Sequence, residues 1–281
     1  MKNIKIAVIG GDIRMYYAGK DLESNGAQVC FTGFEKIGVP SCGEKELSDC
    51  RFVLLPVPLT RDSHSLFAPL CDKRILLDSD LPPLIKSKTV FCCMENTLRR
   101  FCHIGDSEQV FDYYNAPGFA EKNAVLTADA AVSIIHSETN ASLVGKKVLI
   151  LGYGRVGREC ARAVKEDFAD IYVGVRRKES ELEVISHGFT PVSSLNLENM
   201  QKYDLIINTV PYTLLNTTVL DKINKSTLII DLASDGGGTD FKHAEKAGLK
   251  AIYAQGLPGK YYPEKAGKII SQTISQFTGG L

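Results

Sequence analysis

Short apolar runs alternate with longer mixed segments along the chain, a pattern typical of β-strands joined by helices around a parallel sheet. The second half repeats the order of the first, and we interpret five matching runs as corresponding strands. The pairs are 5–11 with 147–154, 27–34 with 169–176, 51–60 with 204–213, 74–78 with 228–231, and 88–93 with 249–254. The pattern predicts the α/β class, with two tandem doubly wound, Rossmann-like parallel-sheet domains. A ligand is expected in the cleft between them, outside the carboxyl ends of the strands.

The segments between these runs predict the domain boundaries. A flavodoxin-like or Rossmann-like substrate domain comes first, followed by a connecting helix for which Thr127 is a plausible N-cap. A dinucleotide-binding domain follows. A last helix, with Pro263 in its first turn, is expected to pack back on the first domain. The predicted divisions are 1–126, 127–144, 145–263 and 264–281.

Composition narrows the class of protein. The chain has 281 residues, and Lys+Arg and Asp+Glu both number 33, giving a formal net charge of +0. This balance predicts neither a nucleic-acid partner nor an anionic-membrane surface. Because no apolar run approaches the ~18 residues that span a bilayer and Ile6–Ile9 is too short for a signal peptide, we expect a cytoplasmic protein. The eight cysteines include no C-x-x-C pair, so reduced, mostly buried thiols are expected rather than a metal site.

A glycine-rich turn follows the strand run at 147–151. Gly152, Gly154 and Gly157 form G-x-G-x-x-G, with Arg155 and Val156 inside the motif. The first glycine permits a tight turn, the second lets a pyrophosphate approach the backbone, and the third lets helix and strand pack closely. The amino end of the following helix would supply N–H groups to the phosphates. The motif predicts dinucleotide binding.

The residue expected to hold the adenosine ribose of NAD is missing. An acid should follow the glycines by about 20 residues, but the chain reads Arg176, Arg177 and Lys178 there. A guanidinium can hold the 2′-phosphate of NADP by paired charge-assisted bonds, and Arg155 could add a second cation. NADP is therefore favoured. NAD remains an alternative, in which the arginines are solvated and Glu179 contacts the ribose.

Two further strand ends carry candidate cofactor contacts. Thr209, Val210 and Pro211 follow one strand and could line the adenosine and pyrophosphate. Ala233, Ser234 and Asp235 follow the next strand, nearer the expected nicotinamide position. The loop at 256–263 fits either a rigid turn over the cofactor or a chain reversal.

The first domain has a turn without a third glycine, so a complete dinucleotide site is not expected there. Arg14 is interpreted either as an exposed helix residue, with Asp12 as the helix cap, or as a ligand of a substrate carboxylate. His136 lies near the end of the connecting helix and is a candidate base. No nucleophile elbow, Walker loop or paired metal-ligand motif is present in the sequence.

Four stretches resemble the A subunits of dipicolinate synthases. They read KIAVIGGDIR, LGYGRVG, DLASDGGGTDFKHAEKAG and GLPGKYYPEKAG, and the similarity runs from Lys5 to about Ile274. The third and fourth stretches are much more specific than the glycine motif. Two positions depart from the family pattern: Lys265 stands where Thr is expected, and Asp129 where Glu is expected. Either departure could alter substrate contacts.

The resemblance implies NAD(P)-dependent oxidation of dihydrodipicolinate or 4-hydroxytetrahydrodipicolinate, small dicarboxylates of the lysine branch, to pyridine-2,6-dicarboxylate. The location implied is the mother cell of a sporulating bacterium. The chemistry needs a hydride acceptor, a base and donors for two carboxylates. Arg14 is the first candidate donor and Lys260 or Lys265 the second, while Asp129, His136 and water are candidates for the base. The resemblance also implies a partner, the flavin-binding B subunit of dipicolinate synthase, and homo-oligomerisation stays open.

Two other functions fit parts of the sequence. One is a 2-hydroxy-acid or shikimate-type dehydrogenase, although the sequence offers no convincing His–acid or Lys–Asp pair for its cleft. The other is a non-catalytic NADP-binding scaffold that positions a flavoprotein partner. The absence of an obvious base in the sequence keeps this second alternative open.

Overall fold

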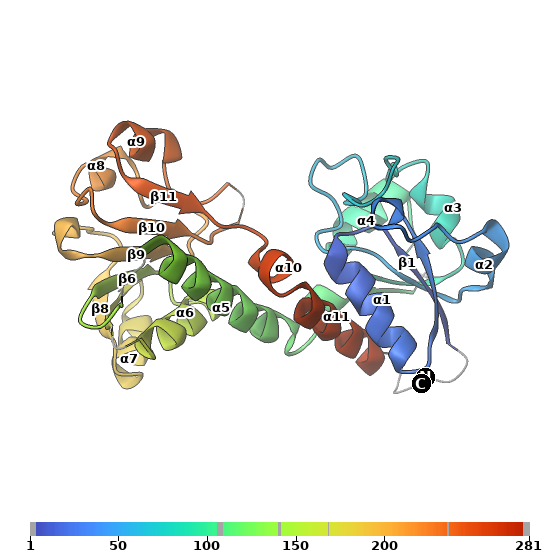
Figure 1. The fold of residues 1–281 in the computed structure, drawn as a ribbon, viewed down its shortest axis with the longest axis horizontal. Helices are drawn as coiled ribbons and strands as arrows, with labels where there is room; N and C mark the ends of the chain where they lie inside the picture. Colours follow the sequence, from blue (N-terminus) through green and yellow to red (C-terminus); the bar gives the residue numbers. More distant parts are fainter. Residues whose placement is uncertain (1–3, 106–108, 140–141, 168, 235, 278–281) are drawn as a thin grey trace. The chain divides into compact units, whose positions relative to one another are not determined.

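The structure is a computed structural model that describes residues 4–105, 109–139, 142–167, 169–234 and 236–277 (Figure 1). The chain forms two compact units, one of residues 1–123 with 258–281 and one of residues 124–257. Each unit contains a parallel sheet, which confirms the predicted α/β class. None of the described helices is both long and apolar enough to cross a membrane.

The first unit has a five-stranded parallel sheet in the order β2-β1-β3-β4-β5. This is the flavodoxin-like order, in which the chain changes direction between β1 and β3. Ile6 of β1 pairs with Val29 of β2 and with Phe52 of β3. Four of the predicted apolar runs become strands because both faces of the sheet are covered, which favours nearly continuous apolar sequence. The strands are β1 (Lys5–Ile9), β2 (Gln28–Thr32), β3 (Phe52–Leu54), β4 (Thr89–Cys92) and β5 (Val110–Asp112).

The run at 74–78 is not a strand of this sheet, so its match with 228–231 is wrong. Ile75 and Leu77 are buried, but their amides and carbonyls pair with the chain at 64–66 rather than with the sheet. The amide of Leu77 donates to the carbonyl of His64 at 3.0 Å, and that of Leu66 to the carbonyl of Ile75 at 2.8 Å. A short apolar run can therefore be a buried loop rather than a buried strand, and the spacing of its apolar residues alone does not distinguish the two.

Helix α1 (Ile13–Ser24) and helix α11 (Pro263–Phe277) lie side by side in the first unit (Figure 1). Gly267 permits this contact, because a Cβ there would lie 2.6 Å from the carbonyl oxygen of Arg14 and 2.7 Å from the amide nitrogen of Ala18. The remaining helical segments of this unit are η1 (Glu35–Ile37), α2 (Glu44–Asp49), α3 (Leu81–Ile85), α4 (Glu95–Cys102) and η2 (Tyr113–Asn115).

Helix α5 (Phe119–Thr139) begins earlier than the sequence predicts. Gly118, in the left-handed region at φ +79°, precedes it, and Thr127 lies in its middle. Thr127 is therefore not its N-cap, and the prediction of a helix start there is wrong. Residues 119–126 carry no Gly or Pro that would stop the helix. A short helix, α10 (Leu257–Tyr261), precedes α11 along the chain.

The second unit has a six-stranded parallel sheet in the order β11-β10-β9-β6-β7-β8. Its two halves diverge from the neighbouring strands β6 and β9, as in the dinucleotide-binding order 3-2-1-4-5-6. The edge strand β8 has no counterpart among the predicted runs. The strands are β6 (Lys147–Leu151), β7 (Asp170–Val175), β8 (Thr190–Ser193), β9 (Leu205–Asn208), β10 (Leu228–Asp231) and β11 (Lys250–Tyr253). The helical segments are α6 (Arg155–Lys165), α7 (Lys178–Ser186), η3 (Met200–Lys202), α8 (Thr217–Leu220) and α9 (Phe241–Lys246).

Candidate functional site

The strand order of the second unit places a binding position between β6 and β9. These neighbouring strands are where the chain changes direction, and ligands of such sheets bind outside the carboxyl ends at this point. The glycine turn follows β6, and Thr209 and Val210 follow β9. The hydroxyl of Thr209 donates to the carbonyl of Leu151 at 2.9 Å. The structure therefore brings together two segments that lie far apart in the sequence.

At two of the three glycines, neighbouring protein atoms leave no space for a side chain. Gly152 has φ +92°, and a Cβ there would lie 2.6 Å from Oγ1 of Thr209 and 2.9 Å from Cγ2 of Val210. A Cβ on Gly157 would lie only 2.2 Å from the carbonyl oxygen of Gly152. Gly152 thus makes the turn and Gly157 lets α6 pack against it.

Gly154 is different, because no described protein atom outside its two chain neighbours lies within 4 Å of the position that its Cβ would occupy. Its backbone, at φ −78° and ψ −167°, is one that any residue adopts. Gly154 is also the N-cap of α6, so the space beside it adjoins the N–H groups of a helix amino end. This open space next to amide donors fits the pyrophosphate of a dinucleotide.

A cationic segment lies at the carboxyl end of β7, beside β6. Arg176, Arg177 and Lys178 are all exposed, and Arg177 is the residue directly before α7. In the described part of the chain, neither arginine side chain forms a hydrogen bond or an ion pair. Arg155, the first residue of α6, is exposed too, as is Glu179 in the first turn of α7. The arrangement provides cations for an anionic ligand group at this strand end.

A buried carboxylate that sequence reasoning missed organises the loop after β10. Asp231 has 0% exposure and accepts hydrogen bonds from Nδ2 of Asn208 at 3.1 Å, the amide of Gly238 at 2.8 Å and Oγ1 of Thr239 at 2.6 Å. Its other oxygen accepts from the amide of Ala233 at 3.0 Å. These donors compensate its burial, and the polar ends of the two apolar runs, IIN and IID, were the only signal in the sequence.

This network joins the loop after β10 to the loop after β9. A Cβ on Gly238 would lie 2.4 Å both from Nδ2 of Asn208 and from the carbonyl oxygen of Val210, so the two loops touch through backbone. Ala233 is buried and Ser234 is exposed, as is Pro211. Asp235 lies outside the described residues. The predicted wall residues are thus held in one connected edge of the sheet.

Arg14 occupies the equivalent switch point of the first unit, between β1 and β3. It is only 7% exposed, so the interpretation as an exposed helix residue is wrong. Its Nη2 lies 2.7 Å from Oδ2 of Asp12 and donates to the carbonyl of Val57 at 2.7 Å, while Nε donates to Oδ1 of Asp12 at 2.9 Å. Arg14 thereby ties the turn after β1 to the segment after β3.

Gly259 completes the surroundings of Arg14. A Cβ at this position would lie 2.6 Å from Nε and 3.1 Å from Cζ of the guanidinium. The glycine in the GLPG stretch therefore makes room for Arg14, as Gly267 does for α1. Cys93, directly after β4, donates to the carbonyl of Pro56 at 3.3 Å. Burial raises the pKa of its thiol to about 12, so it is not a nucleophile near neutral pH.

His136 does not lie beside the glycine turn of the second unit. His136 lies 3.0 Å from the carboxylate of Asp167, which precedes β7. Two residues further along α5, Glu138 pairs with Lys250, the first residue of β11, at 2.6 Å. His136 is therefore at the amino edge of the second sheet, opposite the glycine turn. Asp129 is on the exposed surface of α5, two turns before His136.

Lys260 and Lys265 both belong to the first unit and are exposed. The ammonium of Lys265 lies over the ring of Tyr262, 5.2 Å from its centre. Within the residues that the structure describes, no group of three or more His, Cys, Asp or Glu side chains is arranged to hold a metal ion. The candidate binding residues are therefore those at the two switch points, between β6 and β9 in the second unit and between β1 and β3 in the first.

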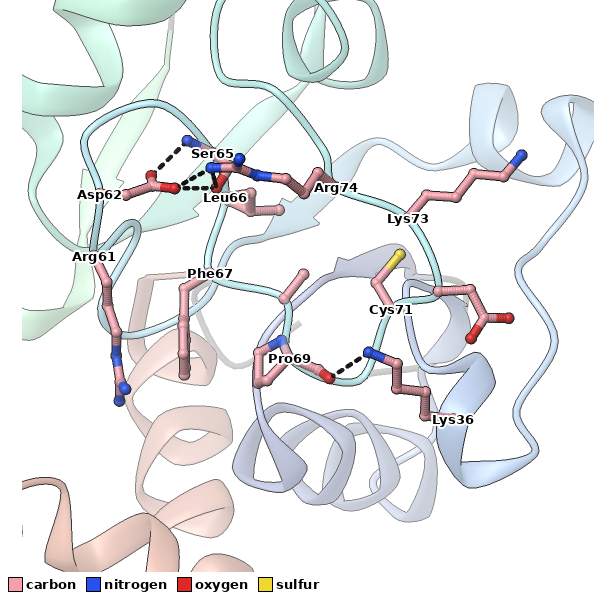
Figure 2. A pocket seen from close by; sticks show the side chains of 12 residues that line it. Lys36, Arg61, Asp62, Ser65, Leu66, Phe67, Pro69, Cys71, Lys73 and Arg74 are labelled. Carbon is pink, nitrogen blue, oxygen red and sulfur yellow. Dashed lines mark hydrogen bonds and ion pairs between the residues drawn. The ribbon is translucent and has the colours of Figure 1, made fainter.

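A hollow of about 350 Å³ lies along the segment 61–74 of the first unit. Figure 2 shows two of its cations, Arg74 and Lys36, joined to neighbouring protein groups. Arg61 stacks on Phe67 with its Cζ 4.2 Å from the ring centre, Arg74 pairs with Asp62, and Lys36 donates to the carbonyl of Pro69 at 3.2 Å. These contacts shape the surface of the loop, and none of the predicted site residues lines the hollow.

The two units match different family models. Residues 5–105 match the N-terminal domain of the dipicolinate synthase A subunits. Residues 142–252 match the NADPH-binding domain of acetohydroxy acid isomeroreductase. The second match covers the glycine turn, the arginines after β7 and the network around Asp231, so this unit has the fold of a nicotinamide-binding domain.

Individual relatives cover nearly the whole chain. The dipicolinate synthase A subunit of Bacillus subtilis (strain 168) is 30% identical over 285 residues, which is 98% of this chain and 96% of the relative. The crystal structure of the dipicolinate synthase A chain from Bacillus subtilis has a TM-score of 0.84 at 28% identity, covering 100% and 97% of the two chains. That of the A subunit from Bacillus halodurans also has a TM-score of 0.84, at 26% identity and 98% coverage of each chain.

Proposed function

Because the chain belongs to the family of dipicolinate synthase A subunits, we propose that it is the NADP-linked oxidoreductase component of such an enzyme. The proposed reaction, in sporulation, converts dihydrodipicolinate, or its 4-hydroxytetrahydro precursor after loss of water, into pyridine-2,6-dicarboxylate. The ring loses a hydride and a proton and becomes aromatic. The bound coenzyme supplies the acceptor for the hydride.

The observation that carries this proposal is the open space beside Gly154. Gly152 and Gly157 have structural reasons to be glycine, whereas Gly154 has none within the described part of the protein. A residue without a side chain is explained there by a ligand that approaches the backbone. The amino end of α6 would hold the pyrophosphate by its N–H groups, and Thr209 and Val210 would border it.

Arg176 and Arg177 support NADP over NAD. A 2′-phosphate carries charge that paired guanidinium bonds recognise well. Both side chains are exposed at the end of β7, which is the strand end that contacts the adenosine ribose in this fold. Ala233 and Ser234, after β10, would lie on the nicotinamide side.

Arg14 is proposed to bind one carboxylate of the substrate. Nε and Nη2 are held by Asp12 and by the carbonyl of Val57, which fixes the plane of the guanidinium. Nη1 then has a defined direction in which to donate to a carboxylate. Lys265 is a second cation of the same unit and could bind the other carboxylate. His136 is not assigned as the base, because it lies at the amino edge of the second sheet, and Asp129 and water stay the candidates for this role.

Membership of a family of A subunits implies a partner chain, and we propose that this partner binds flavin. A second candidate function is then a scaffold that binds NADP and leaves the chemistry to the flavoprotein. The position of His136 at the amino edge of the sheet favours this candidate, since it removes one of the predicted bases from the site.

The test replaces one glycine without disturbing the fold. Gly154→Asp puts a carboxylate into the pyrophosphate space, and we expect NADPH affinity to fall by at least about 100-fold, as for a charge forced against a buried anion. Gly43→Asp is the matched control, since Gly43 is also an N-cap with extended backbone and with only Glu46 within 4 Å of its Cβ position. Binding is measured by calorimetry, and folding by circular dichroism.

Product formation separates the two functions. We expect the purified chain to reduce NADP⁺ to NADPH as the substrate is oxidised in the presence of its partner, and Gly154→Asp to abolish this. If the chain alone forms NADPH in this way, the scaffold function is excluded. If Gly154→Asp binds NADPH as the wild type does, the proposed coenzyme site is wrong.

A further inference from the structure

Three cysteine thiols meet at the edge of the first sheet. Cys30 lies in β2, the edge strand, Cys42 lies in the connection that follows it, and Cys50 lies directly after α2. The sulfurs of Cys30 and Cys42 are 2.6 Å apart, and those of Cys50 and Cys30 are 3.7 Å apart. Cys30 is therefore the common neighbour of two other thiols.

Hydrogen bonds to backbone groups hold Cys42 and Cys50 in place, so their positions do not depend on the thiols. The amide of Cys42 donates to the carbonyl of Phe31 at 2.8 Å, beside Cys30. The ammonium of Lys88 donates to the carbonyl of Cys50 at 2.6 Å and to that of Leu47 at 2.8 Å. The site is built by the strand, the connection and the helix end together.

The spacing fits a covalent bond between sulfurs and not a metal ion. Zinc–sulfur bonds of about 2.3 Å in a tetrahedral site keep ligand sulfurs about 3.8 Å apart. Cys30 and Cys42, at 2.6 Å, are too close to share an ion in that way. A disulfide requires only a small further approach of the two side chains.

Small molecules can reach the site. A hollow of about 450 Å³ is lined by all three cysteines, with Lys5, Glu46 and Asp49 among the charged residues around it. Cys30 and Cys42 are partly exposed, and Cys50 is buried but lines the hollow. Cys92, Cys93, Cys102 and Cys160 are buried and do not line it, so the hollow distinguishes this group from the other buried thiols.

We propose that Cys30, Cys42 and Cys50 form a peroxide-reactive thiol site, in which Cys30 makes alternative disulfides with Cys42 and Cys50. This site is independent of the proposed coenzyme site, which belongs to the other unit.

The reaction balances with peroxide as the oxidant. The thiolate of Cys42 attacks one peroxide oxygen, the O–O bond breaks, and the departing hydroxide takes a proton to become water, which leaves a sulfenic acid. The sulfur of Cys30 then attacks this sulfur, the S–S bond forms, and a second water leaves with the proton of Cys30. Two sulfurs lose two electrons in total, and peroxide gains them.

The local contacts favour Cys42 as the attacking group. A hydrogen bond from the Cys30 thiol, against the opposing effect of burial, lowers the pKa of Cys42 below its usual value. The same thiol lowers the pKa of Cys50, but Cys50 is buried whereas Cys42 is partly exposed to the hollow. Cys50 can then attack Cys30 in the disulfide, which expels Cys42 as thiolate and gives the second disulfide. Either bond would tie the edge strand β2 to the chain that follows it.

Tryptic mapping tests the proposal, because each cysteine falls in its own peptide. Cys30 lies in 21–36, Cys42 in 37–45 and Cys50 in 46–51. After one equivalent of hydrogen peroxide and alkylation of the full chain, we expect 21–36 joined to 37–45, with a loss of about 2 Da that a thiol reductant reverses. In Cys42→Ser, 21–36 should join 46–51 instead, because Cys50 then attacks the peroxide and Cys30 attacks the resulting sulfenic acid with loss of water. In Cys30→Ser, neither link should form.

Cys71→Ser is the matched control, since Cys71 is also partly exposed but lies outside the group, and it should leave the wild-type link unchanged. Absence of any link containing 21–36 in the wild type would overturn the proposal, as would oxidation that stops at sulfinic acid on single cysteines. This comparison uses the wild-type chain and stays decisive even if a cysteine variant fails to fold.

Discussion

We expect Arg176→Ala and Arg177→Ala each to weaken the binding of NADPH while leaving the binding of NADH nearly unchanged. The coenzymes differ only by the 2′-phosphate, so a group that contacts this phosphate acts on one of them. Neither arginine forms an ion pair or a hydrogen bond through its side chain within the described residues. Their removal should therefore leave the free protein undisturbed.

The size of the expected loss in NADPH affinity follows from the exposure of the two arginine side chains. Hydrogen bonds to charged groups contribute about 1.5–3 kcal/mol, and the exposure of both side chains places them at the lower end. A loss of about 1.5 kcal/mol raises Kd roughly tenfold for each variant. Since the contact is between exposed charges, the difference should shrink as the salt concentration rises from about 0.05 to about 0.5 M, where the Debye length falls below about 10 Å.

Fluorescence titration of NADPH and NADH against each variant measures the effect. Arg162→Ala is the control, because Arg162 is an exposed arginine of α6 that pairs with Glu159 at 2.8 Å, beyond the glycine motif on the same helix. Equal weakening of both coenzymes by Arg176→Ala and Arg177→Ala would refute the 2′-phosphate contact. So would unchanged NADPH affinity in the variant lacking both arginines.

Three predictions concern positions where the structure has no space for an added Cβ atom or no other acceptor for buried hydrogen-bond donors. Gly157→Ala should destabilise the second unit by about 2 kcal/mol and weaken NADPH binding, because its Cβ would lie 2.2 Å from a carbonyl oxygen; Gly154→Ala, tested alongside by urea unfolding, should cost much less stability. Asp231→Asn should cost about 3 kcal/mol in the same assay, since one of the two oxygens that accept from buried donors becomes an amide nitrogen that cannot accept. The exposed Asp221→Asn should change the stability little. Gly267→Ala should lower Tm by separating α1 from α11, and Lys268→Ala, exposed on the same helix, should not. Wild-type stability in any of the first-named variants would contradict the packing described for that position.

The sequence predicted the glycine turn well because its determinants are local. A strand, three glycines at fixed spacing and a helix define the geometry within about a dozen residues, and Thr209 and Val210 follow from the rule that parallel strands end at one edge. The fold class followed from the alternation of apolar runs in the same way.

What the sequence could not supply depends on contacts between distant segments. Asp231 becomes a loop organiser only because Asn208 and Thr239 reach it, and nothing in the local pattern separates this from a capping residue. His136 was a candidate base until its pairing with Asp167 placed it at the amino edge of the sheet. The run at 74–78 was misread because burial, which its apolar residues do reflect, does not require a strand.

The most direct test is a crystal structure of the chain with NADPH. We predict the pyrophosphate against the backbone at Gly154 and the first turn of α6, within hydrogen-bonding distance of the amides, and the 2′-phosphate against the guanidinium groups of Arg176 and Arg177. A coenzyme bound elsewhere on the chain, or crystals that take up none at saturating concentration, would contradict the account.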